Sequence, residues 1–146
     1  PELTKERLVN GWVLSGDVGK IDKNGYVYLT DRKDDMIISG GFNIWPAELE
    51  NVISSLEGVR EVAVVAEPHP RWGEVPVAVV VTLPGKSPSE EDIISACKVQ
   101  LGSYKRPGRV ILQEDPLPRT PVGKIQRKAA RELFWDQDTD IHISGA

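Results

Sequence analysis

The sequence is poor in cysteine and histidine, and each shortage excludes a class of protein. Its one cysteine, Cys97, cannot form an internal disulfide, so a reducing, cytoplasmic setting is expected. The surrounding residues DIISACKVQL predict a small buried side chain there rather than a nucleophile. The two histidines, His69 and His142, have no partners at metal-ligand spacing, and the sequence predicts neither a metal site nor a histidine base.

Long apolar runs and an excess of positive charge are missing as well. No apolar run approaches the length of a membrane span, and the N-terminal residues PELTKERLVNGW do not form a signal peptide. The net charge of −4 argues against a nucleic acid as the partner of the whole surface. Because the chain does not begin with methionine, it is expected to be part of a longer protein.

The composition is otherwise that of an ordinary globular protein. The 146 residues, 40% hydrophobic and 27% charged, suffice for one compact domain with its own core. Basic side chains gather in the C-terminal third, at Lys105, Arg106, Arg109, Arg119, Lys124, Arg127, Lys128 and Arg131. This local excess suits a phosphate-bearing small molecule, or it forms a solvated helix face and loop.

Two glycine-containing turns organise the first third of the chain. The segment WVLSGDVGKIDKNGYVYLTDR is typical of two strands joined at Asn24-Gly25, because both residues tolerate a positive φ. The next extended stretch, DMIISGGFNI, is interrupted by Gly40-Gly41. Paired glycines in a strand indicate a bulge, or the close approach of another backbone or of a ligand.

The rest of the chain alternates between helical and extended patterns. Pro46 suits the first turn of a helix that ends at Gly58, and Ser87 or Ser89 caps a second helix. The expected strands are 59–67, 75–83 and 106–114, and a last helix is expected at 125–135. The expected inward-facing residues of the first two helices are Leu49, Val52, Ile53, Leu56, Ile93, Ile94, Cys97 and Leu101. The predicted fold class is α+β, with helices packed on a short mixed sheet after a β-hairpin.

The segment PRTPVGKIQRK presents one lysine, Lys124, on a restrained loop. Pro118 and Pro121 stiffen the loop, and Gly123 permits a tight turn beside the lysine. A lysine is a mobile point charge that binds phosphate and stabilises growing charge in a phosphoryl or nucleotidyl transfer. The alternative is an exposed loop lysine before an amphipathic helix.

Four segments in a fixed order carry a resemblance to a known family. GWVLSGD, DRKDDMIISGGFNIWPAELE, PHPRWGE and PLPRTPVGKIQRK resemble motifs of the adenylate-forming (AMP-binding) enzymes, in particular the C-terminal lid domain of acyl-CoA synthetases and aryl-CoA ligases. The resemblance implies that residues 1–31 end a large N-terminal AMP-binding domain and that 32–134 form the lid. Residues 135–146 are expected to form a flexible tail.

The resemblance implies a nucleotide role for three residues. Asp17 matches an aspartate that binds the ribose hydroxyls of ATP, and Arg32 matches an arginine on the ribose and phosphate side. Lys124 matches the catalytic lysine that holds the acyl carboxylate and the α-phosphate during adenylation. The alternatives are a turn aspartate at position 17 and, at Arg32, a surface ion pair with Asp31 or Asp34.

The resemblance also implies residues for the movement of the lid and for the thiol. Asp34 matches the hinge about which the lid rotates between two half-reactions, although a solvated charge is the alternative. Gly40 and Gly41, with Phe42, match the loop that lines the tunnel for the pantetheine arm of CoA. Asn43 is uncharged where some relatives carry an arginine near the CoA phosphates, so that contact is not carried over. Trp72 of the WGE segment is interpreted as mainly structural, with a contact to adenine or CoA as the alternative.

The implied reaction joins a carboxylic acid to ATP, giving acyl-AMP, and then to CoA. ATP with Mg²⁺, CoA and a small-molecule carboxylic acid are the expected ligands, and the chain's own N-terminal AMP-binding domain is the expected partner. No nucleic acid and no membrane span are expected, and the chain alone is expected to be inactive. A lysine acetyltransferase and deacetylase acting on Lys124 are further expected partners. Alternatives are a lid for carrier-protein loading or luciferase-like chemistry, or a stand-alone module that binds a small ligand or a protein.

Overall fold

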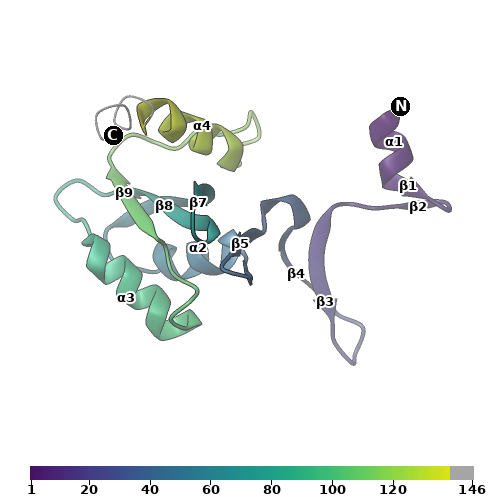
Figure 1. Ribbon diagram of the computed structural model, residues 1–146, viewed down its shortest axis with the longest axis horizontal. Coiled ribbons are helices and arrows are strands. Elements are labelled where there is room, and N and C mark those ends of the chain that lie inside the picture. Colours follow the sequence, from purple (N-terminus) through teal and green to yellow (C-terminus); the bar gives the residue numbers. More distant parts are fainter. Residues whose placement is uncertain (139–146) are drawn as a thin grey trace.

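The computed structural model describes residues 1–138 of the chain. Its first part consists of a short helix and two hairpins. These elements are α1 (Glu2–Arg7), β1 (Leu8–Val9), β2 (Trp12–Val13), β3 (Asp17–Ile21) and β4 (Val27–Arg32). Figure 1 shows them to one side of the remaining elements, to which β4 leads through the 3₁₀ helix η1 (Lys33–Asp35).

The second part combines a five-stranded sheet with three helices. Its elements are β5 (Ile37–Ser39), β6 (Phe42–Ile44), α2 (Pro46–Ser54), β7 (Val59–His69), β8 (Gly73–Thr82), α3 (Glu90–Leu101), β9 (Arg109–Gln113) and α4 (Arg127–Asp138). The strands run in the order β6-β5-β8-β7, and β9 pairs with β8 in parallel. All other pairs in this sheet are antiparallel, which confirms the predicted α+β fold with a mixed sheet.

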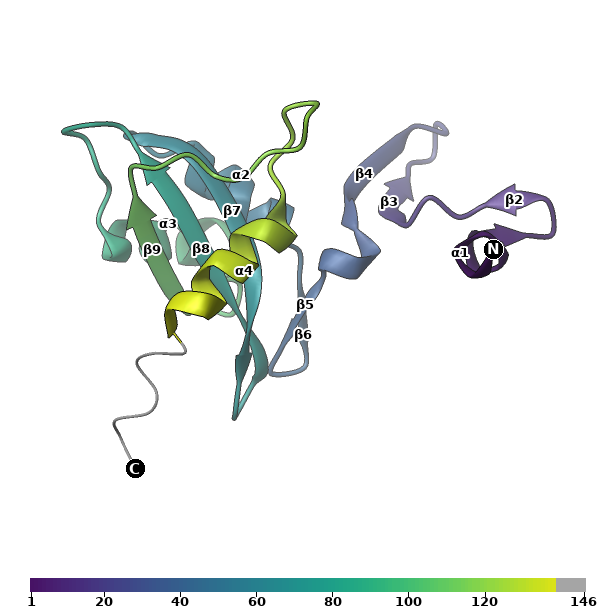
Figure 2. The same cartoon turned by 90° about the horizontal axis from the view of Figure 1, so that it is seen from above.

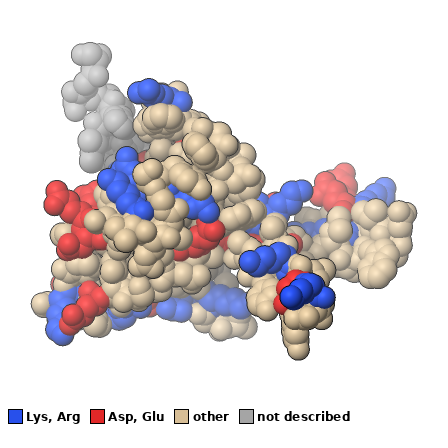
Figure 3. All heavy atoms as spheres, turned by 90° about the horizontal axis from the view of Figure 1, so that it is seen from below, with Lys and Arg blue, Asp and Glu red and all other residues tan. Residues whose placement is uncertain are grey.

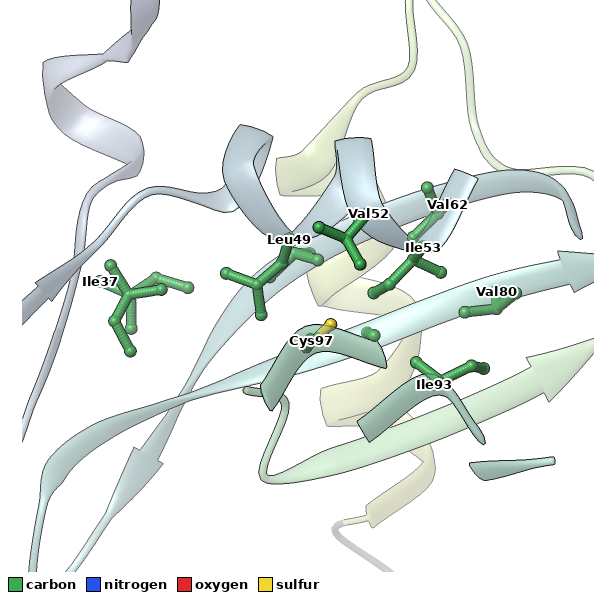
Figure 4. Close-up of a cluster of buried hydrophobic side chains, with 11 residues drawn as sticks. Ile37, Leu49, Val52, Ile53, Val62, Val80, Ile93 and Cys97 are labelled. Atoms are coloured by element: carbon green, nitrogen blue, oxygen red, sulfur yellow. The ribbon is translucent and has the colours of Figure 1, made fainter. Parts of the chain in front are cut away.

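The sheet is covered on both faces. Alternate residues of β7 and β8 point to opposite sides, so the continuous valine and alanine runs of these strands are buried on both faces. Figures 1 and 2 show α4 across one face, with α2 and α3 against the other. The larger core lies under α2 and α3 and contains Leu49, Ile53, Ile93 and Cys97, as Figure 4 shows. The smaller core lies under α4 and includes Val79, Leu117 and Ala130.

Both predicted glycine turns are present. Gly25 has a φ of 87° at the tip of the β3–β4 hairpin, where Asp22 accepts hydrogen bonds from the amides of Asn24 and Tyr26. Gly40 and Gly41, with φ of 57° and 85°, form the two-residue turn between β5 and β6. Positive φ at both positions is the signature of a type I′ hairpin turn, which explains the paired glycines.

Several element boundaries differ from the sequence expectation. The helix α1 was not expected, α4 begins at Arg127 rather than Ile125, and it extends to Asp138. Of the two candidate caps, Ser89 is the one that accepts from the amide of Asp92, in a capping box. Ile93 is fully buried as expected, but Ile94 is only half-buried because it lies at the border of the apolar face of α3.

Candidate functional site

Lys124 lies in a tight loop whose residues bond to one another. The amide of Thr120 donates to the Lys124 carbonyl at 2.7 Å, and the amide of Gly123 donates to the Thr120 carbonyl at 2.8 Å. The Thr120 hydroxyl accepts from the amide of Lys124 at 3.1 Å. Gly123 takes a φ of 85°, which a residue with a Cβ rarely adopts. Lys124 is exposed, and within residues 1–138 its ammonium makes no hydrogen bond or ion pair.

The loop is tied to the sheet by an arginine and a glutamate. Arg119 donates from Nη1 to the Gly123 carbonyl at 2.7 Å and from Nη2 to Oε1 of Glu61 on β7 at 2.7 Å. Oε2 of Glu61 accepts from the amide of Leu117 at 2.9 Å. Partial burial alone would raise the pKa of Glu61, but the bonds from Arg119 and Leu117 outweigh it and the pKa is lowered. Glu61 therefore carries its charge throughout the neutral range.

A second arginine, Arg127, gathers three carboxylates from separate segments. Its Nη1 lies 2.8 Å from Oδ1 of Asp31 and 2.7 Å from Oδ2 of Asp35, and its Nη2 lies 2.6 Å from Oε2 of Glu50. Oδ2 of Asp31 also accepts from the amide of Ala47 at 2.8 Å, and the Asp31 side chain is only 4% exposed. Burial opposes the charge of Arg127, but the bonds to Glu50 and Asp31 prevail and raise its pKa. The cluster thus joins the end of β4, η1, α2 and α4.

Asp17 and Arg32 are direct neighbours across the β3–β4 hairpin. The two residues are register partners, and Nε of Arg32 lies 3.7 Å from Oδ1 of Asp17. Arg32 has its ion pair with Asp17, whereas the alternative partner Asp31 binds Arg127. Arg32 and Lys124 also line the same hollow of about 770 Å³, with Arg127 beside them. Of the three residues expected at a nucleotide, Arg32 and Lys124 thus share one hollow, whereas Asp17 does not line it and is connected to it only through its ion pair with Arg32.

Two of the three residues expected at a thiol line another hollow, of about 530 Å³, whereas Gly41 does not line it. Gly40 and Phe42 line it from the β5–β6 hairpin, and Trp72 lines it from the turn between β7 and β8. The ring of Phe42 stacks on Tyr104 with centroids 4.6 Å apart. The amide of Gly40 donates to the Trp72 carbonyl at 2.9 Å, so the two turns are joined.

The expected hinge residue, Asp34, lines neither of these two hollows. It is exposed in η1 and lines a third hollow, together with Asp35 and Arg131. His69, for which no partner was expected, accepts on Nδ1 from the amides of Arg71 and Trp72, both at 3.2 Å. It shapes the turn before β8. His142 lies outside the described residues.

Much of the basic excess of the C-terminal third is consumed by ion pairs. The pairs are Lys105–Glu48, Arg109–Glu67, Arg119–Glu61 and Arg127 with its three carboxylates. The face drawn in Figure 3 accordingly shows acidic and basic groups interspersed rather than one basic area. Sequence reasoning missed the partners of Arg119 and Arg127, because Glu61, Asp31 and Glu50 lie far away from them along the chain.

A comparison with known families gives a match that ends at Lys124. Residues 48–124, from α2 to the exposed lysine, match the family of AMP-binding enzyme C-terminal domains. The chain belongs to this family.

Within residues 1–138 no group of three or more His, Cys, Asp or Glu is arranged to hold a metal, and none of the helices described there is long and apolar enough to cross a membrane.

Two curated relatives of this AMP-binding C-terminal domain are ligases several times its length. It is 46% identical over 134 residues to the long-chain-fatty-acid–CoA ligase FadD13 of Mycobacterium tuberculosis, over 92% of this chain and 26% of the ligase. It is 45% identical over 135 residues to the fatty acid–[acyl-carrier-protein] ligase ScoC of Streptomyces coeruleorubidus, with the same two shares. The crystal structure of ATP-bound MatB from Rhodopseudomonas palustris superposes with a TM-score of 0.84 at 39% identity, over 94% of this chain and 27% of MatB. The chain thus spans about a quarter of the length of these relatives.

Proposed function

We propose that this chain is the C-terminal part of an ATP-dependent acid–thiol ligase that forms acyl-CoA. In the first half-reaction a carboxylate attacks the α-phosphate of ATP, giving acyl-AMP and releasing pyrophosphate. In the second, the thiol of CoA attacks the acyl carbon, giving the thioester and releasing AMP. Residues 1–31 would complete the N-terminal AMP-binding domain, and residues 32–134 would form the lid that serves both half-reactions.

The observation that carries this proposal is the position of Lys124. An unpaired ammonium on an exposed, internally bonded loop is ready to meet a ligand, because no carboxylate among residues 1–138 has to be displaced first. During adenylation it would bind the acyl carboxylate and the α-phosphate and stabilise the charge that develops as pyrophosphate leaves. ATP would bring Mg²⁺ with it as part of the substrate.

Asp17 and Arg32 support a nucleotide in the hollow beside Lys124. A carboxylate that accepts two hydroxyl bonds suits a ribose diol, and Asp17 keeps acceptor capacity because Arg32 approaches only one of its oxygens, at 3.7 Å. Arg32 is more than half exposed at 57% and can turn toward phosphate oxygens. Both residues would bind, and neither would exchange protons with the substrate.

The hollow at Gly40 supports the second half-reaction. A glycine turn allows a thin pantetheine arm to pass close to the backbone, and Phe42 and Trp72 add apolar walls. Because this hollow and the one at Lys124 have separate walls, a lid that rotates about Asp34 would present them to the bound adenylate in turn.

Exposed apolar side chains support the N-terminal AMP-binding domain as a partner. On the two hairpins, Trp12, Ile21 and Leu29 are 77%, 71% and 70% exposed. Several large apolar side chains left exposed in one part of a chain suit an interface with a partner. Alone, the chain would lack the other walls of the nucleotide and acyl sites and would be inactive. Lys124 is also exposed enough for acetylation, which would remove the charge that adenylation uses.

The test is an assay of the complete gene product that carries this chain, with a panel of carboxylic acids. Pyrophosphate release would report adenylation, and thioester formation with CoA or with a carrier-protein thiol would identify the acceptor. Lys124→Ala should abolish most pyrophosphate release, whereas Lys98→Ala, an exposed lysine on α3, should not. Absence of any acid-dependent pyrophosphate release, or full activity of Lys124→Ala, would refute the proposal, as would turnover by the chain alone.

A further inference from the structure

We propose that Arg119 is a positioning residue for Lys124: its guanidinium, anchored by Glu61, holds the Gly123 carbonyl and so fixes the direction in which the lysine projects. This inference rests on the proposed role of Lys124 in adenylation. It assigns to Arg119 and Glu61 a part in the reaction without contact with the substrate.

The loop needs such an anchor because its tip has no packing. Residues 121–124 are all exposed, so no buried side chain fixes their direction. The hydrogen bonds between Thr120 and Lys124 close the turn on itself, but they do not orient it relative to the sheet. Leu117, before the loop, is buried in the smaller core, and Ile125, after it, packs against that core. Between these two, Arg119 connects the tip to β7.

The atom that Arg119 binds makes the anchor effective. The Gly123 carbonyl belongs to the peptide unit that ends at the Cα of Lys124, and a peptide unit is planar. Arg119 binds the oxygen of this unit at 2.7 Å, and the Thr120 hydroxyl binds its N–H at 3.1 Å. With both polar groups of one rigid plane held, the Lys124 Cα and the start of its side chain are held too.

Glu61 is suited to hold Arg119 in turn. It lies within the long strand β7, its side chain is only 11% exposed, and its two oxygens take separate donors, Arg119 and the Leu117 amide. Arg119 likewise uses its two terminal nitrogens on separate acceptors. A guanidinium can reach two separate acceptors with its planar fork of N–H donors, whereas a lysine ammonium has no such fork. The geometry therefore needs arginine at position 119.

Misplacement of Lys124 should lower the rate of only one half-reaction, adenylation. A reacting group displaced by about 1 Å can cost about a hundredfold in rate, because orientation supplies much of the catalysis. Lys124 is used in adenylation, and the attack of the thiol on acyl-AMP does not need it. Loss of Arg119 should therefore slow the formation of acyl-AMP and leave the use of supplied acyl-AMP unchanged.

The experiment measures both half-reactions separately in the complete gene product. Arg119→Ala should lower acid-dependent pyrophosphate release about ten- to a hundredfold. Thioester formation from supplied acyl-AMP and CoA should stay within about twofold of the parent protein. Arg119→Lys, which keeps one of the two bonds, should fall between. Arg60→Ala is the matched control, since Arg60 is an exposed cation next to Glu61 on β7 with no bond to the loop.

A double variant separates positioning from a general structural effect. In the Lys124→Ala background the further change Arg119→Ala should not slow adenylation again, because there is no lysine left to position. A multiplied loss in the double variant would overturn the proposal, as would equal losses of both half-reactions in Arg119→Ala. If Arg119→Ala does not fold, Thr120→Val tests the other end of the same peptide unit with the same expectation. Failure of Lys124→Ala itself to slow adenylation would instead refute the proposed function.

Discussion

The indole of Trp72 lies against the backbone of Gly40, where a Cβ atom would fall 2.8 Å from Cε3 of the ring. Gly40 also has a φ of 57°, so both its space and its backbone conformation favour glycine. Gly41, the other turn residue, has a φ of 85°, but a Cβ atom added there would meet nothing within 4 Å. For an added Cβ atom the two glycines therefore differ in space: at Gly40 it would meet the Trp72 ring, and at Gly41 it would meet nothing.

Gly40→Ala should destabilise the chain more than Gly41→Ala. Both changes strain a left-handed residue by about 1 kcal/mol, and the clash with Trp72 should add about 1–3 kcal/mol at position 40. Chemical denaturation of the two variants measures the difference. In a Trp72→Ala background the two costs should become equal, and a difference that persisted there would contradict the packing argument.

Removal of Arg127 should cost much more than removal of an exposed cation. Arg127→Leu leaves Asp31, Asp35 and Glu50 without their shared partner in a partly buried place, with an expected loss of about 3 kcal/mol. The comparison is Lys86→Ala, whose pair with Glu57 is 65% and 83% exposed and should be worth less than about 1 kcal/mol. Similar unfolding free energies for the two variants would show that the cluster on Arg127 is not stabilising.

The charge of Glu61 should make the chain lose stability in acid. Its folded-state pKa lies below the ordinary value of 4.5, so its contribution is complete above that pH and is lost as the pH falls through the folded-state value. The unfolding free energies of the parent and of Glu61→Gln should therefore converge as the pH falls below 4.5. Thermal unfolding across that range measures this, and a constant gap would contradict it.

The thiol of Cys97 should be inert in the folded chain. The side chain is fully buried, and burial raises its pKa to about 11, so neither access nor thiolate is available at neutral pH. Because the chain has one cysteine, labelling with a disulfide reagent gives a clean readout. Reaction should be slow in buffer and complete in denaturant. Rapid full labelling of the native chain would disprove the buried position.

Local patterns in the sequence predicted the parts of the fold that depend on local chemistry. The valine runs of β7 and β8, the proline at the start of α2, the cap at Ser89 and the Gly40-Gly41 turn each have a reason within a few residues. Helix α1 was missed because none of its six residues is buried and its sequence shows no apolar stripe. Ile94 was expected in the core because the sequence of α3 suggests a wide apolar stripe. In the structure the part of α3 that packs against the core is narrower and leaves Ile94 half-buried.

In the candidate site, only the residues on the exposed loop and turns could be predicted from the sequence. Lys124 and Gly40-Gly41 carry their own turn chemistry, and motif resemblance added Asp17, Arg32 and Asp34. The residues that hold these loops in place come from distant segments of the chain. They are Glu61 for the loop of Lys124, Trp72 for the Gly40-Gly41 turn and Tyr104 for Phe42. A charge count recognises Arg119 and Arg127 as basic, but the carboxylates that they bind are decided by tertiary packing.

The ion pair of Asp31 with Arg127 joins a residue before Asp34 in the sequence to a residue after it. Asp31 precedes Asp34, whereas Ala47 and Arg127, which both hold the Asp31 carboxylate, follow it. Any rotation about Asp34 that moves residues 1–31 against the sheet would have to break both bonds and hydrate a nearly buried charge. Such a motion would not be a continuous swing. It would pass between discrete arrangements across an electrostatic barrier, and its rate would depend on how readily water and salt replace Arg127 at Asp31.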